Sequence, residues 1–175
     1  MSPEITLAPE QPDDDAFLFE LYSTTRAAEM ALTPWNEEQR GVFLRQQYEL
    51  RRFHYLRYYP GAEYLLIRGG GDPVGRIAIH RAENEIRILD IALVPEQRGM
   101  GIGSQLIHEL LVEAGFENIP VTLHVERHNR AAGLYRRLGF CVIEDGGVYL
   151  FLKWVPQSHL QPSLSTKTNR RFHAI

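Results

Sequence analysis

Three glycines in five residues, set between an apolar stretch and a helical pattern, are the residues best placed for chemistry in this 175-residue chain. They are Gly99, Gly101 and Gly103. Residues 86–94 before them read as a strand, and apolar residues at helical spacing follow. A helix start offers unpaired N–H groups and partial positive charge, and glycine lets a phosphate approach the backbone closely. The pattern therefore predicts a loop that holds a phosphorylated ligand.

The spacing of this loop separates it from two other phosphate-binding loops. A P-loop requires a lysine after its last glycine, but the only lysines of the chain are Lys153 and Lys167. A dinucleotide-binding loop requires Gly-x-Gly-x-x-Gly and an acidic residue about 20 positions later. Here the spacing is Gly-x-Gly-x-Gly, and residues 121–125 contain no acid. Both classes are therefore disfavoured.

The loop does fit Gln/Arg-x-x-Gly-x-Gly/Ala, spelled here from Arg98 to Gly103. This spelling resembles the acyl-coenzyme A pyrophosphate loop of the GNAT superfamily of N-acetyltransferases. Downstream, residues 121–129 read as the next strand, and residues 130–140 resemble the family's Asn-x(n)-Leu-Tyr-x-x-Leu-Gly-Phe helix. The resemblance covers roughly residues 63–155 and implies acetyl-coenzyme A as co-substrate, without a metal.

The resemblance also implies which residues bind the coenzyme. A strand edge would bond to its pantetheine arm, and the glycine loop would hold its pyrophosphate. Asn129 would cap the following helix and bond to pantetheine as well. The implied set is Ile91, Ala92, Leu93, Arg98, Gly99, Met100, Gly101, Ile102, Gly103, Ser104 and Asn129.

Acetyl transfer to an amine requires a neutral amine and a proton for the departing thiolate. His124 is the candidate base, because its ordinary pKa of about 6.5 lets it accept a proton at neutral pH. Strand alternation puts Glu126 on the same face, as a rival. Tyr135 matches the tyrosine that protonates the thiolate in the resembled family. Where histone-type members carry a glutamate, this chain has Arg87, so that variant of the mechanism is disfavoured.

Other polar groups are better explained by structure than by chemistry. Asp90 lies among apolar neighbours, on the face expected for Ile86 and Ile88, and is interpreted as a buried, hydrogen-bonded carboxylate. Cys141 is the only cysteine and is expected to fill the core. The aromatics of a helix over residues 36–59 are also expected in the core, with its arginines solvated. By the resemblance, residues 31–36 and Tyr149 wall the acceptor site.

The element order read from the sequence is β-α-α-β-β-β-α-β-α-β-β, with Gly115 and Gly139 expected to end helices. The fold class predicted from it is α/β, as a GNAT fold. A mixed six- to seven-stranded sheet would carry helices on both faces and a V-shaped splay between its central parallel strands. Residues 1–155 are expected to form one domain, and residues 156–175 a polar tail.

Composition limits the partners. The net charge is −3 and the basic residues do not cluster, which disfavours nucleic acid. No apolar run approaches the length of a membrane span, and no leader is evident, so a cytoplasmic location is expected. The expected function is an N-acetyltransferase acting by direct attack on a small-molecule or peptide amine. A non-catalytic acyl-coenzyme A sensor and an acyltransferase using another thioester stay open, as does a homodimer.

Overall fold

The structure, a computed structural model, describes residues 4–157 of the chain. The expected polar tail therefore lies outside the described residues, apart from Pro156 and Gln157. Seven strands form one sheet in the order β1-β2-β3-β4-β5-β7-β6. The strands are β1 (Ile5–Pro9), β2 (Glu63–Gly69), β3 (Asp72–Ala82), β4 (Glu85–Leu93), β5 (Val121–Glu126), β6 (Cys141–Asp145) and β7 (Tyr149–Trp154).

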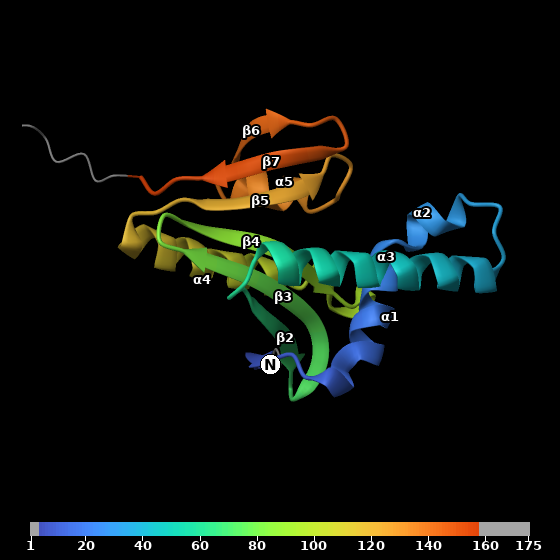
Figure 1. The fold of residues 1–175 in the computed structure, drawn as a ribbon. Coiled ribbons are helices and arrows are strands. Elements are labelled where there is room, and N and C mark those ends of the chain that lie inside the picture. The colour runs from blue at the N-terminus through green and yellow to red at the C-terminus, as the bar shows by residue number, and fades with distance from the viewer. Residues whose placement is uncertain (1–3, 158–175) are drawn as a thin grey trace, which may run out of the picture.

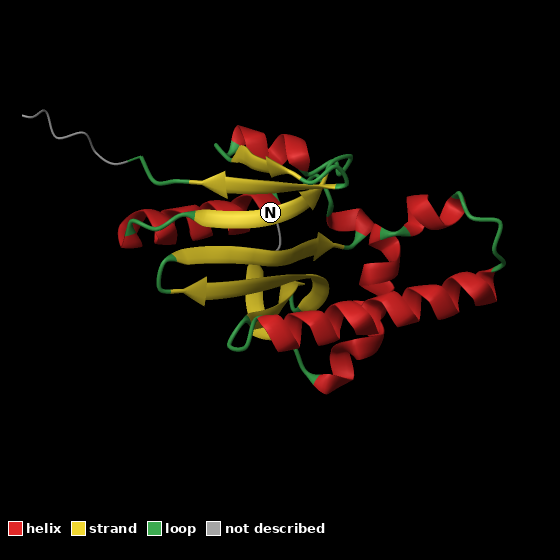
Figure 2. Cartoon of the chain, turned by 45° about the horizontal axis from the view of Figure 1, so that its top comes forward, coloured by secondary structure: helices red, strands yellow, loops and turns green. Residues whose placement is uncertain are grey.

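Helices cover both faces of the sheet (Figures 1 and 2). Helices α1, α2 and α3 lie on one face, whereas α4 and α5 lie on the other, so the predicted α/β class is confirmed. Their bounds are α1 (Asp15–Thr25), α2 (Ala27–Ala31), α3 (Glu37–Tyr58), α4 (Ile102–Glu117) and α5 (Ala132–Arg137). Within residues 4–157, no helix is both long and apolar enough to span a bilayer.

Local sequence signals set most helix ends. Asn36 caps α3 as expected, because its side chain accepts from the backbone N–H of Gln39, whose side chain accepts in return from the N–H of Asn36. Gly139 follows α5 with φ +93°, as predicted. The expectation for Gly115 is wrong. Helix α4 continues through it to Glu117, and the C-cap residue Asn118 takes the left-handed conformation itself at φ 54°.

The sheet contains one parallel pair, and that pair is short. Strands β4 and β5 are paired only from Ile86–Val121 to Ile88–Leu123, although both strands continue beyond. All other neighbours in the sheet are antiparallel. The predicted splay between the central parallel strands is therefore present.

A bulge in β4 changes which face its later residues occupy. Ile79 pairs with Ile88, but Ala78 pairs with Asp90, so Leu89 is an extra residue. The extra residue reverses the alternation, and Asp90 lies on the face opposite to Ile88. The sequence expectation for the face of Asp90 is therefore wrong, because simple alternation cannot detect a bulge.

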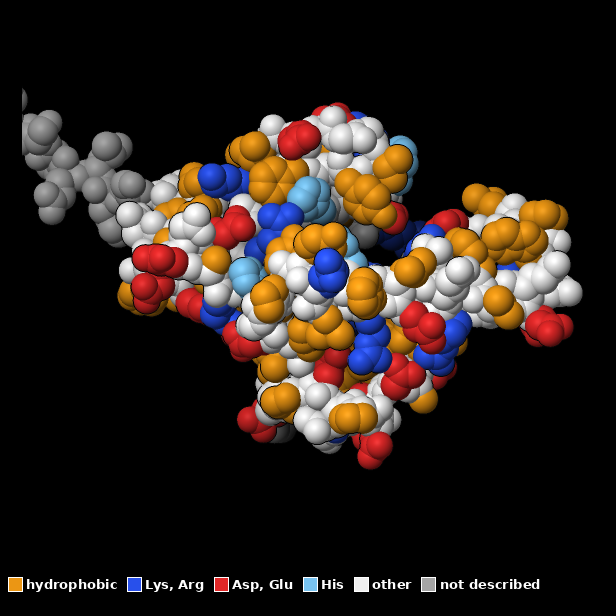
Figure 3. Space-filling view, viewed as in Figure 1, with side chains coloured by type: hydrophobic (Ala, Val, Ile, Leu, Met, Phe, Trp, Pro, Cys, Tyr) orange, Lys and Arg blue, Asp and Glu red, His pale blue; other side chains and the backbone are white. Residues whose placement is uncertain are grey.

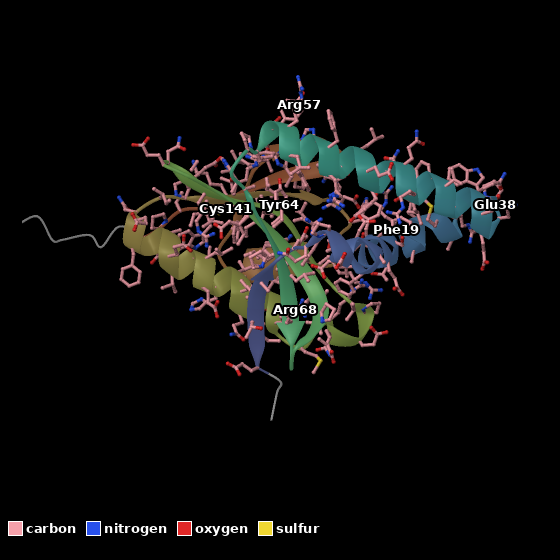
Figure 4. The ribbon with its side chains drawn as sticks, turned by 60° about the horizontal axis from the view of Figure 1, so that its bottom comes forward. Phe19, Glu38, Arg57, Tyr64, Arg68 and Cys141 are labelled. Atoms are coloured by element: carbon pink, nitrogen blue, oxygen red, sulfur yellow. The ribbon has the colours of Figure 1, made fainter. Side chains whose placement is uncertain are left out.

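Two apolar clusters hold the layers together. The larger lies between the sheet and helices α4 and α5. The smaller joins α1 and α3 to the sheet, through residues such as Leu18, Tyr48 and Leu66. Figure 4 shows α3 crossing the sheet with Phe19 of α1 beside it. The splayed ends of β4 and β5 thus lie between two packed layers.

Candidate active site

The place where β4 leaves β5 is the first component of the site. Beyond Ile88, β4 stays paired with β3 as far as Leu93, so it keeps its course while the pairing to β5 has ended. The approach of β3 requires glycine at position 75, because a Cβ there would lie 2.4 Å from the carbonyl oxygen of Ala92. Residues 91–93, expected to bind the coenzyme, are therefore held rigidly on one side and have no strand partner among the described residues on the other.

The glycine loop is the second component. Gly99 and Gly101 have φ of 76° and 87°, a conformation that other residues adopt only with strain. A Cβ built on either would meet no atom within 4 Å, so the backbone borders open space. Gly101 is also the N-cap residue of α4, whose first N–H groups have no partner within the helix. This arrangement can accept a phosphate.

Arg98, expected to bind the coenzyme, also makes hydrogen bonds within the protein. Its Nε donates to the carbonyl oxygen of Leu93 at 2.8 Å, and a terminal nitrogen donates to Oγ1 of Thr24, also at 2.8 Å. Both bonds stay within the protein and connect the loop to β4 and α1. These bonds hold the start of the glycine loop against its neighbours.

Tyr135 reaches the site from α5 and is almost fully buried, at 5% exposure. Its ring packs edge-on against Phe140, with ring centres 5.7 Å apart. Burial, and to a smaller extent the charge of Asp90, raises the pKa of Tyr135 to about 12. The hydroxyl is therefore protonated at any working pH and can act as a hydrogen-bond donor.

His124 lies on the opposite face of the sheet, one residue beyond the last β4–β5 pair. Its ring stacks on Phe151 at 4.8 Å, and its Nδ1 is 2.8 Å from a terminal nitrogen of Arg87. A guanidinium can only donate, so Nδ1 is the acceptor and the ring proton is on Nε2. Burial, followed by the charge of Arg87, lowers the pKa of His124. His124 is thus neutral, but its lone pair is engaged by Arg87.

Glu126, the rival base, lies further along the same face and is exposed. Its Oε1 accepts from the hydroxyl of Tyr149, directly opposite on β7, at 3.4 Å. Burial, and next the charge of Glu126, raises the pKa of Tyr149. The structure therefore brings together a predicted base and a predicted acceptor-site residue, at the wider end of the splay.

Asp90 belongs to a buried ionic network, as expected for a structural carboxylate. One of its oxygens is 2.5 Å from Arg51 of α3, and the other is 3.5 Å from Arg76 of β3. Arg76 in turn lies 2.9 Å from Glu10. Burial is the main cause that raises the pKa of Glu10. This network fixes α3 on the sheet beside the splay.

Helix α3 makes more polar contacts with β4 than its sequence predicted. Arg51, expected in solvent, pairs with Asp90, and Tyr55 donates to the carbonyl oxygen of Leu89 at 2.8 Å. In contrast, Phe53 and Tyr58, expected in the core, are both 63% exposed. The sequence did contain a sign of this network. Arg76 lies in the apolar run of residues 74–79, and Asp90 lies in the next strand. Charges in such strands need a partner on another element to compensate them.

The structure also places the other expected residues. Asn129 accepts from the N–H of Ala131, in the turn that leads into α5. Residues 31–36 connect α2 to α3, and Asn36, the N-cap of α3, is about 20 Å along the helix axis from Arg51 at 1.5 Å per residue. Cys141 is exposed on the edge strand β6, so its expected core role is wrong. Figure 3 shows a hollow between the β5–β7 part and α3, with basic and histidine side chains at its border.

Comparison with known proteins agrees with this geometry. The profile of the acetyltransferase (GNAT) family matches residues 24–140. The putative ribosomal protein bS18-alanine N-acetyltransferase of Bacillus subtilis (strain 168) is 31% identical over 99 residues. That match covers 55% of this chain and only 63% of the relative.

Solved structures share the fold. The PaiA N-acetyltransferase of Thermoplasma acidophilum in complex with coenzyme A superimposes with a TM-score of 0.64 at 20% identity, over 87% of this chain and 99% of that one. Arabidopsis thaliana Naa50 in complex with the bisubstrate analogue CoA-Ac-MVNAL gives a TM-score of 0.57 at 19% identity, over 86% of this chain and 97% of that one.

Proposed function

The chain belongs to the acetyltransferase (GNAT) family, and on that premise we propose that it is an N-acetyltransferase using acetyl-coenzyme A. The observation that carries the proposal is the end of β4–β5 pairing at Ile88, upstream of a glycine loop that opens α4. A splayed strand edge and a helix N-terminus can hold an extended arm and a diphosphate together. Residues 91–93, Arg98 to Ser104 and Asn129 are the proposed binding set.

The proposed reaction is direct attack by a primary amine. The nitrogen lone pair forms the new C–N bond at the thioester carbonyl, the C–S bond breaks, and the thiolate departs. The proton of the nitrogen goes to a base on the acceptor face, His124 or Glu126, and the thiolate takes its proton finally from solvent. Tyr135 stabilises the departing sulfur by donating a hydrogen bond from the buried side.

The amine is proposed to be that of a small molecule or the α-amine of a peptide. A lysine-like amine of pKa about 10.4 costs near 4.6 kcal/mol to deprotonate at pH 7, whereas an α-amine near 7.8 costs only about 1 kcal/mol. An α-amine thus needs less help from a base whose lone pair is engaged. The names of the Bacillus relative and of the Naa50 complex, an alanine N-acetyltransferase and a peptide conjugate, support a peptide.

The test is release of free thiol from acetyl-coenzyme A with a panel of small amines and short peptides. We expect turnover with at least one acceptor. We also expect acetyl-coenzyme A to bind more tightly than shorter thioesters that lack the diphosphate. Coenzyme binding without turnover on any acceptor would reject the catalytic claim and favour a sensor. Comparing acetyl-, succinyl- and longer acyl thioesters in the same assay identifies the acyl group.

A further inference from the structure

Arg87 differs from the other arginines over the acceptor face. Arg51, Arg76 and Arg26 each have a carboxylate oxygen within 2.5–2.9 Å. Among the described residues, the carboxylate that pairs with Arg87 is that of Glu85, and its oxygen is 3.9 Å away. The other oxygen of Glu85 accepts from Thr122 at 2.9 Å, which holds that carboxylate in place. Glu85 therefore pairs with Arg87 without a hydrogen bond, and its carboxylate does not occupy the guanidinium donors.

The position of Arg87 is well defined despite this weak pairing. Its guanidinium lies between two aromatic rings, 5.7 Å from the centre of Tyr59 and 5.5 Å from that of Phe151. The side chain is 18% exposed, so one part of it reaches solvent. Its strand position pairs with Thr122, one step before the splay opens. A cation that no carboxylate of residues 4–157 hydrogen-bonds, in contact with two rings, thus lies beside the splay.

The contact of Arg87 with His124 has a chemical consequence. While the guanidinium donates to Nδ1 at 2.8 Å, His124 has no free lone pair to take a proton from an amine. A carboxylate accepts two parallel hydrogen bonds from a guanidinium and competes well against a neutral imidazole nitrogen. An anion that binds Arg87 would therefore release Nδ1.

Resting on the proposed acetyl transfer, we infer that the acceptor carries an anionic group, a carboxylate, close to its amine, and that Arg87 binds it. Binding of the carboxylate moves the guanidinium off Nδ1 of His124. The freed nitrogen then takes the proton that the attacking amine loses as the C–N bond forms. An acceptor without the anion leaves His124 blocked. The carboxylate could belong to an amino acid or to an acidic side chain of a peptide.

The experiment compares matched acceptors that differ only in this charge. One arm uses 4-aminobutyrate and its amide, and the other uses a peptide with aspartate or asparagine after its first residue, each rate corrected for the neutral fraction of the amine. In at least one arm we expect kcat/KM about tenfold higher for the carboxylate, and the responding arm identifies the source. Equal rates for acid and amide in both arms would overturn the inference while leaving acetyl transfer intact.

Variants test whether Arg87 itself, and not positive charge elsewhere on the protein, causes the preference for the carboxylate. In Arg87→Met we expect the acid-to-amide ratio to fall to about one, and the acidic limb of the kcat/KM profile to move to higher pH, because the cation no longer lowers the pKa of His124. Arg57→Met is the matched control, since Arg57 is exposed and points away from the sheet (Figure 4). It should keep the ratio. A ratio that survives Arg87→Met, or is lost in Arg57→Met, contradicts the assignment.

The wild-type ratio decides the question even if Arg87→Met does not fold, and Arg87→Lys gives a second variant. Lysine keeps the charge but loses the paired donors, so we expect the ratio to fall only in part. If the wild type turns over no acceptor of either arm or of the general amine panel, the proposed function fails, and this inference fails with it.

Discussion

Burial changes what the hydroxyl of Tyr135 can do. A thiol has an ordinary pKa of about 8.5, and burial raises the pKa of the Tyr135 phenol to about 12, which makes it a weaker acid toward a thiolate than an ordinary tyrosine. The sequence-based expectation of full proton transfer assumed a phenol near pKa 10. We therefore propose that the hydroxyl donates a hydrogen bond to the sulfur and keeps its proton.

Tyr135→Phe should therefore lower kcat about 10- to 100-fold, because one buried donor to developing negative charge is lost. The affinity for coenzyme A should change less than twofold. Thiol-release kinetics and calorimetry measure both quantities. Tyr58→Phe, at an exposed tyrosine of α3, is the control and should behave as wild type. An unchanged kcat in Tyr135→Phe would exclude this role.

The acidic limb of the pH profile of kcat/KM shows which residue is the general base. A base works in its neutral form, so the rate is flat above its pKa and falls as pH drops through it. Because burial and Arg87 lower the pKa of His124, that fall should come below about pH 6.5. His124→Gln should lower kcat/KM and remove the limb, whereas Glu126→Gln should keep it. The reverse pattern would assign the base to Glu126. Rates corrected for amine protonation are the measurement.

Among the elements, α4 begins at the proposed binding site, and its other end is an ordinary helix end. Gly101 has φ +87° at the N-cap, whereas Gly115 lies inside the helix with open space where a Cβ would be. The two glycines belong to the same helix but satisfy different requirements. Only the first is tied to the proposed phosphate site.

Gly101→Ala should weaken coenzyme A binding at least tenfold and destabilise the protein by about 1–2 kcal/mol, because alanine is strained in the left-handed region. Gly115→Ala should instead raise the free energy of unfolding by about 0.5–1 kcal/mol and leave binding unchanged. Calorimetry and urea denaturation distinguish these effects. Normal binding and stability in Gly101→Ala would mean that the loop conformation is not required.

In the whole molecule, the network of Glu10, Arg76, Asp90 and Arg51 connects the helical layer to the sheet. Asp90→Asn would leave two largely buried arginines with reduced compensation, and should destabilise the fold by about 3 kcal/mol. It should also lower the pKa of Tyr135. Asp145→Asn, which breaks an exposed pair with Arg127, is the control and should change little. Equal urea midpoints for the two variants would contradict the structural role of the network.

The sequence alone determined the strand order along the chain, the glycine loop before α4, the cap at Asn36 and the presence of His124 and Tyr135 on β5 and α5. These features depend on periodicity, capping and glycine conformation, which act over a few neighbouring residues. The sequence reading missed the break that divides the first predicted helix into α1 and α2. The family resemblance added the splay, and the structure confirmed it.

Only the tertiary structure decided how these residues work. The bulge at Leu89 places Asp90 beside Arg51, and β4–β5 pairing places Arg87 on Nδ1 of His124. Burial behind the sheet raises the pKa of Tyr135. Each of these effects needs groups that are far apart in the chain to meet within a few ångströms. Hydrogen bonding and desolvation depend on such distances, and local sequence patterns do not contain them.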